Sequence, residues 1–178
     1  MKFAADCMLG TLAKWLIILG HDVAFFRSVD DAELVALAVR ERRTILTRDR
    51  RLVKRRAARD HILIRSQDLR DQIRQVLEAR RLAVRPEALF RRCTACNLST
   101  RAVPRSSVRG EVPPYVFRSQ RRFKRCPRCR RIYWRATHVE RMIGSLRERL
   151  PHLDPAAAAP PGPTRSGARR PRRARSRA

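Results

Sequence analysis

The stretch KFAADCMLGTLAKWLIILG, residues 2–20, decides the fold class. A short apolar run ends at Asp6, and apolar residues then recur at the spacing of one helix face. These residues are Met8, Leu9, Leu12, Trp15, Leu16 and Leu19. Gly20 follows as a helix-terminating residue. A strand at residues 2–6 that leads directly into a helix at residues 8–19 is the opening unit of an α/β fold.

The same alternation continues to about residue 90. Further strands are expected at 23–26, 44–47 and 61–65. Helices are expected from Asp31 to about residue 39, at 50–58 and at 68–82. Strands and helices that alternate at such short intervals predict a parallel sheet with helices on both faces. We therefore predict an α/β fold for this region.

Charge indicates the class of partner. The 178-residue chain carries 43 Lys and Arg against 16 Asp and Glu, a net charge of +27. Such an excess is typical of proteins that bind polyanions, and RNA or DNA is the first candidate. Hydrophobic residues make up 43% of the sequence, enough for a folded core.

The charge also divides the chain into three regions. Residues 1–90 carry +7, residues 91–150 carry +14, and residues 151–178 carry +6. We predict a first domain at 1–90, a small module at 91–150 and a disordered basic tail at 151–178. The tail is either an unselected extension or a segment for non-specific RNA contact. The longest apolar run near the start, residues 15–19, is too short to span a membrane, so we expect a cytoplasmic protein without membrane contact.

Four of the five cysteines form two close pairs. Cys93-Thr-Ala-Cys96 and Cys126-Pro-Arg-Cys129 are separated by 29 residues. Each C-x2-C turn presents two sulfurs to one ion, and four thiolates form the preferred shell of structural zinc. The long gap favours a zinc ribbon with a hairpin between the turns. Two disulfides are the alternative. A closed shell of four sulfurs has no position for water, so this Zn²⁺ is structural.

Three acidic residues follow successive strands. Asp6, Asp31 and Asp49 fall at the carboxyl edge of the predicted sheet, where α/β folds bind ligands. Carboxylates without histidine or cysteine prefer hard ions such as Mg²⁺ or Mn²⁺. Each aspartate also precedes a predicted helix, where it could act only as an N-cap. Caps on separate helices would have no reason to converge. Asp68 and Asp71 are candidates for a fourth acid.

Several separate motifs agree with one family in order and spacing. They are Asp6 to Leu16, Asp31-x-Glu33-Leu34, Leu46 to Asp49, Arg92 to Asn97, and Cys126-Pro127-x-Cys129 followed by Tyr133-Trp134-x-x-x-His138. Over residues 1–145 the chain resembles the Mut-seven C-terminal ribonuclease family. The resemblance implies a PIN-like nuclease fold with a C-terminal zinc ribbon, and metal-dependent RNA cleavage with Asp6, Asp31 and Asp49 as the acidic set. Ala136 stands where the family usually has glycine.

Basic and aromatic residues near these motifs are candidate RNA contacts. They are Arg48, Arg50, Arg51, Arg125, Arg128, Tyr133, Trp134 and His138. The alternatives are a solvated basic surface for the arginines, a small core for the two aromatic residues and a packing role for the histidine.

The sequence therefore predicts a ribonuclease that uses Mg²⁺ or Mn²⁺ to hydrolyse phosphodiester bonds. A non-catalytic RNA-binding or ribosome-associated adaptor is the second hypothesis. A PIN-type toxin paired with an antitoxin is the third.

Overall fold

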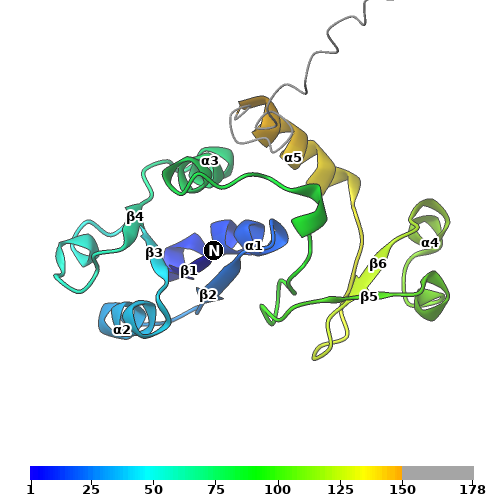
Figure 1. The fold of residues 1–178 in the computed structure, drawn as a ribbon, viewed down its shortest axis with the longest axis horizontal. Coiled ribbons are helices and arrows are strands. Elements are labelled where there is room, and N and C mark those ends of the chain that lie inside the picture. Colours follow the sequence, from blue (N-terminus) through cyan, green and yellow to red (C-terminus); the bar gives the residue numbers. More distant parts are fainter. Residues whose placement is uncertain (150–178) are drawn as a thin grey trace, which may run out of the picture.

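Two sheets organise the chain in the computed structural model, which describes residues 1–149 (Figure 1). The side chains of His138, Arg147 and Arg149 lie outside the described part, as does the predicted tail at 151–178. The first sheet is parallel, with strand order β2-β1-β3-β4. Its strands are β1 Lys2–Ala5, β2 Asp22–Phe25, β3 Thr44–Thr47 and β4 His61–Leu63. The predicted α/β fold with a parallel sheet is confirmed.

Helices cover both faces of this sheet. They are α1 Gly10–Ile18, α2 Asp31–Glu41 and α3 Leu69–Ala79. Alternate side chains of a strand point to opposite faces. Phe3 therefore packs in the core with α1 and α3, whereas its neighbour Ala4 packs in the core with α2. Because both faces are covered, β3 is buried along its whole length and β1 from Phe3 onward, rather than at alternate positions.

The main differences from the predicted elements lie in the short helices. The chain leaves β1 through a 3-10 turn, η1 Cys7–Leu9, before α1 begins. The helix expected at 50–58 is wrong, since only the 3-10 turn η2 Leu52–Lys54 forms there. Leu52 is the one residue of η2 that enters the core, so this basic segment has no apolar stripe to hold a longer helix.

The second sheet is a small antiparallel ribbon. Its strands are β5 Arg101–Val103, β6 Phe123–Arg125 and β7 Ile132–Tyr133, in the order β5-β6-β7. The turn η3 Pro86–Ala88 precedes the ribbon. The expected hairpin is the β5–β6 pair, but its connection contains η4 Arg105–Val108 and α4 Pro114–Ser119. Val108, Val112, Val116 and Phe123 form a separate core beneath this connection.

The last helix, α5 Thr137–Arg149, returns from the ribbon to the parallel sheet. Val139, Ile143 and Leu146 recur on one face and pack into the core that contains α1 and α3 (Figure 1). Cys93 and Tyr133 belong to the same core. The ribbon and the parallel sheet therefore share buried surface. No helix within residues 1–149 is long and apolar enough to cross a membrane.

Candidate active site and metal centre

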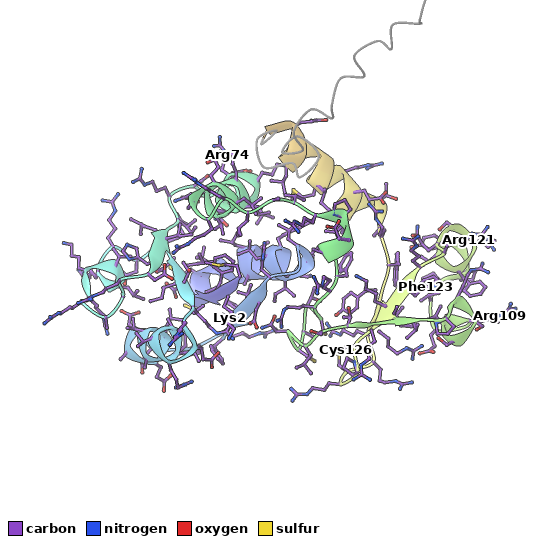
Figure 2. The ribbon with its side chains drawn as sticks, viewed as in Figure 1. Lys2, Arg74, Arg109, Arg121, Phe123 and Cys126 are labelled. Atoms are coloured by element: carbon purple, nitrogen blue, oxygen red, sulfur yellow. The ribbon has the colours of Figure 1, made fainter. Side chains whose placement is uncertain are left out.

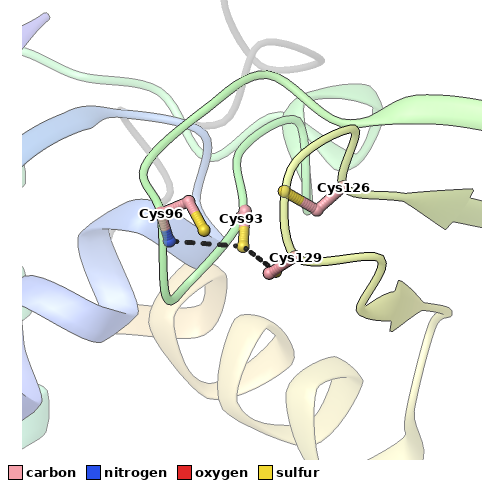
Figure 3. A group of neighbouring side chains, drawn as sticks. All are labelled: Cys93, Cys96, Cys126 and Cys129. Carbon is pink, nitrogen blue, oxygen red and sulfur yellow. Dashed lines mark hydrogen bonds between the residues drawn. The ribbon is translucent and has the colours of Figure 1, made fainter.

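Four cysteine side chains converge at the base of the ribbon (Figure 3). The sulfurs of Cys93, Cys96, Cys126 and Cys129 all lie within 4.8 Å of one another. The Sγ atoms of Cys93 and Cys129 are 3.5 Å apart. Four sulfurs at about 2.3 Å from one ion would be separated by about 3.8 Å. The cluster is a candidate metal site, and its four soft ligands fit zinc.

Both C-x2-C turns have the same backbone geometry. In the first, the N–H of Asn97 donates to the carbonyl of Cys93, and the N–H of Cys93 donates to the carbonyl of Leu98, both at 2.8 Å. The second turn repeats both bonds at Cys126. The residue after each pair is left-handed, with φ of 54° at Asn97 and 63° at Arg130. Two equivalent turns present their sulfurs to one point.

Tyr133 supports the cluster. Its hydroxyl donates to Sγ of Cys93 at 3.0 Å, and its ring stacks on Phe90 at 5.6 Å. Burial by itself raises the pKa of the Cys93 thiol, but the Tyr133 hydroxyl and two backbone N–H groups lower it to about 6. Tyr133 is only 9% exposed. The protein covers most of its ring, in keeping with the alternative of a small core.

Asp22 joins the ribbon to the parallel sheet. One of its carboxylate oxygens accepts from Arg43 at 2.6 Å and from Nδ2 of Asn97 at 2.8 Å. The other oxygen pairs with Arg92 at 3.1 Å. The Asn97 side-chain oxygen also accepts from the N–H of Val23 at 3.3 Å. The first cysteine turn therefore covers part of the edge strand β2.

The candidate acids lie at the other end of the strands. Asp6 follows β1 and Asp49 follows β3, and these adjacent strands flank the point where the strand order reverses. Thr47 links the two residues. Its hydroxyl donates to Oδ2 of Asp6 at 2.7 Å and accepts from the N–H of Asp49 at 2.9 Å. Asp6 is 8% exposed, so the hydroxyl holds a nearly buried carboxylate in place.

Capping does not account for Asp6 or Asp31. Asp6 precedes η1 but makes no side-chain capping bond. The cap of α2 is Asp30, whose side chain accepts from the N–H of Glu33 at 2.8 Å. Asp31 instead pairs with Arg55 at 3.1 Å. The alternative hypothesis, in which the aspartates are only N-caps, therefore does not describe Asp6 or Asp31.

The remaining acids have local partners. Asp49 accepts from the N–H of Arg51 at 2.6 Å, which orders the turn after β3. Asp68 caps α3 through the N–H groups of Arg70 and Asp71. Asp68 is thus a cap rather than a fourth active-site acid.

The convergence expected for the three candidate acids is not found within residues 1–149. Among the residues that the structure describes, the cysteines are the group of three or more possible ligands that lie within 4.8 Å of one another. Asp6, Asp31 and Asp49 do not form such a group in the described part of the chain. Mg²⁺ is commonly held by one or two carboxylates together with water and substrate phosphate.

An open pocket of about 570 Å³ lies at the carboxyl ends of β3 and β4. Its lining residues are Arg48, Arg50, Leu63, Ile64 and Arg65. Three guanidinium groups beside Asp49 suit a phosphate backbone. The sequence analysis named Arg48 and Arg50 but missed Arg65 and Thr47. Thr47 and Arg65 lie at the ends of two predicted strands, and this position could have identified them as site residues.

The candidate RNA contacts on the ribbon differ in their exposure to solvent. Arg125 is 9% exposed and binds both carboxylate oxygens of Glu111, at 2.9 and 2.7 Å, so its guanidinium holds the ribbon together instead of facing RNA. Arg128 is exposed and Trp134 is half-buried. The side chain of His138 lies outside the described residues. Figure 2 shows Arg121 at the outer end of the ribbon, away from the parallel sheet.

Comparison with known families gives a result that agrees with this architecture. The family described as the Mut7-C RNAse domain matches residues 1–146. The chain belongs to this family. No curated protein matches the chain significantly. Membership of the Mut7-C RNAse family supports a nuclease-like role on RNA, and the match covers the parallel sheet, the cysteine cluster and most of α5.

In this Mut7-C chain the ribbon contact and the candidate acid Asp6 lie at opposite ends of the parallel strands. Asp6 follows the last residue of β1, whereas Asp22 is the first residue of β2 and contacts the ribbon. The C-terminal end of α1 also meets the ribbon side, where the carbonyl of Ile18 accepts from the N–H of Phe90 at 2.9 Å. A strand of four residues spans about 13 Å. The contact with the first cysteine turn and the candidate acid Asp6 therefore lie about one strand length apart.

Proposed function

We propose that the protein hydrolyses RNA phosphodiester bonds at the carboxyl edge of its parallel sheet, with Mg²⁺ or Mn²⁺ held by Asp6, Asp31 and Asp49. The observation that carries the proposal is the Thr47 hydroxyl at the point where the strand order reverses, because it donates to the Asp6 carboxylate and accepts from the backbone N–H of Asp49. A nearly buried carboxylate needs a compensating partner, and Asp6 has the Thr47 hydroxyl; a cation would stabilise it further.

In this proposal some residues orient the acids and others supply positive charge for the RNA backbone. Thr47 fixes the orientation of the Asp6 carboxylate, and the turn after β3 fixes Asp49. A divalent ion at this edge supplies an activated water and neutralises charge on the phosphate. Arg48, Arg50 and Arg65 hold the RNA backbone beside these acids.

The test is cleavage of a labelled single-stranded RNA by the zinc-loaded full chain with Mn²⁺. Asp49→Asn should lower the rate about 100-fold or more, the usual effect of removing an electrostatic catalytic group. Asp60→Asn is the matched control because Asp60 lies at the amino end of β4 and pairs with Arg80. It should cut at the wild-type rate.

Two outcomes would contradict the proposal. One is cleavage by Asp49→Asn at the rate of the wild type, with circular dichroism showing that both are folded. The other is salt-sensitive RNA binding by the wild type without turnover in either Mg²⁺ or Mn²⁺. The second outcome would assign the non-catalytic adaptor function instead.

A further inference from the structure

A second pocket lies between the turn η3 and the ribbon, outside the acidic site. It has a volume of about 370 Å³, near the lower end of the range for ligand pockets, about 300–1,000 Å³. Its lining residues are Pro86, Glu87, Leu89, Phe90, Arg122, Lys124, Tyr133, Trp134 and Arg135. The pocket combines an apolar floor with three basic side chains and one acidic side chain, Glu87.

The floor is held by contacts within the protein. Leu89 and Phe90 are buried, and the Phe90 ring stacks on Tyr133. Tyr133 is fixed in turn by its hydrogen bond to Cys93. Trp134 packs against the small ribbon core and also lines the pocket. The apolar surface is therefore preformed, and Trp134 is its half-exposed aromatic wall.

Two cations on the rim have no acidic partner within residues 1–149. The ammonium of Lys124 donates to the carbonyl of Leu89 at 2.7 Å, and Arg122 forms no ion pair in this part of the chain. Arg135 differs, because it pairs with Glu140 at 3.3 Å. Uncompensated cations beside an aromatic side chain suit a ligand that joins a planar ring to an anion.

We propose that this pocket binds one unpaired nucleotide of a single-stranded RNA, with its base on Trp134 and its phosphate at Arg122 and Lys124. The choice of RNA rests on the proposed function. Bases of a duplex are stacked inside the helix, whereas unpaired bases stack on aromatic side chains. The pocket lies on the ribbon side and the acids at the far end of β1, so it holds a nucleotide distant from the bond that is cut.

The first experiment measures binding without cleavage. The zinc-loaded full chain is titrated with a labelled 12-nucleotide RNA in buffer without Mg²⁺ or Mn²⁺, at several salt concentrations. Each phosphate contact to a single strand adds about 0.7 to the slope of log affinity against log salt. Arg122→Ala should lower that slope by about this amount. Arg121→Ala is the matched control, since the neighbouring Arg121 is exposed but does not line the pocket.

The second experiment tests stacking directly. Trp15→Phe leaves Trp134 as the single tryptophan, and its fluorescence should be quenched by the same RNA. Trp134→Ala should weaken binding about tenfold, a typical loss for one stacked base. Because that variant also loses packing in the ribbon, Trp134→Phe serves as the folded comparison and should retain most of the affinity.

Three results would overturn the inference. They are equal slopes for Arg122→Ala and Arg121→Ala, unchanged Trp134 fluorescence on binding, and equal affinity for a matched RNA duplex. Failure of the proposed function is distinguishable from these results. If Asp49→Asn still cuts RNA, the acidic site is wrong, but quenching and the Arg122 effect would still establish the nucleotide pocket.

Discussion

Replacing Asp22 by asparagine removes the negative charge that joins the ribbon to the parallel sheet. The Asp22 carboxylate accepts hydrogen bonds from Arg43 and Asn97 and forms an ion pair with Arg92. Arg43 follows α2, and Arg92 and Asn97 flank the first cysteine turn. The side chains of Arg43 and Asp22 are 9% and 15% exposed. The substitution therefore leaves a nearly buried guanidinium without its closest counter-charge.

The contacts set the size of the effect. Removing one partner of a buried ion pair costs about 3–5 kcal/mol. Arg43 keeps the carboxylate of Glu41 at 2.7 Å and the carbonyl of Phe3 at 3.1 Å, and asparagine keeps one acceptor oxygen. We therefore expect Asp22→Asn to lower the free energy of unfolding by about 2–3 kcal/mol at pH 7.

The effect should depend on pH. Burial raises the pKa of Asp22, but hydrogen bonds from Arg43 and Asn97 and the charges of Arg43 and Arg92 lower it overall. A lowered pKa in the folded state adds stability above the ordinary aspartate pKa, about 3.9, and this stability is lost as the pH falls through the folded-state pKa. The difference between wild type and Asp22→Asn should be full at pH 6–7 and shrink below about pH 4.

Urea unfolding of the zinc-loaded protein, followed by circular dichroism, measures both effects. Glu140→Gln is the control, because the pair of Glu140 with Arg135 is about half exposed on both sides and should change stability by less than about 1 kcal/mol. If Asp22→Asn destabilises no more than Glu140→Gln, the Asp22 contacts do not hold the two sheets together. A difference that persists unchanged into acid would contradict the ionic origin of the effect.

The other predictions concern single contacts. Tyr133→Phe removes the hydrogen bond to Cys93 and should cost about 1 kcal/mol and speed zinc loss to a chelator, measured with a colorimetric zinc indicator. Gly20→Ala should destabilise by more than about 1 kcal/mol in urea, because φ is 96° and a Cβ would lie 2.6 Å from the carbonyl oxygen of Ala88. Arg130→Gly relieves a φ of 63° and should raise the melting temperature. An unchanged melting temperature would show that this turn carries no strain.

The parallel sheet was predictable because its information is local. The strand at Thr44–Thr47 and the helix start at Asp31 fall where periodicity placed them. The cysteine spacing likewise identifies four ligands that do converge. Each strand, helix and C-x2-C turn consists of residues close in sequence, where spacing translates directly into geometry, and the preference of one ion for four thiolates predicts that the two distant turns meet.

Contacts between distant residues were not predictable in the same way. Nothing in the sequence joins Asp22 to Asn97, which are 75 positions apart, or shows that Arg125 is used by Glu111. An arginine in a basic stretch looks the same whether it faces solvent or a buried carboxylate. The helix α5 is different, since Val139, Ile143 and Leu146 have the spacing of one helix face and pack in the core.

The separation of the two centres limits what each can do. The first residue of β2 contacts the cysteine turn, and the residue after β1 is the candidate acid Asp6, so the full length of a strand lies between them. In the proposed function, cations on the ribbon side are therefore too distant to neutralise a phosphate held beside Asp6. That task falls to Arg48, Arg50 and Arg65, which share the carboxyl edge with the acids. A ribbon that contacts RNA must act on nucleotides away from the bond that is cut, and this makes affinity and cleavage separable by mutation.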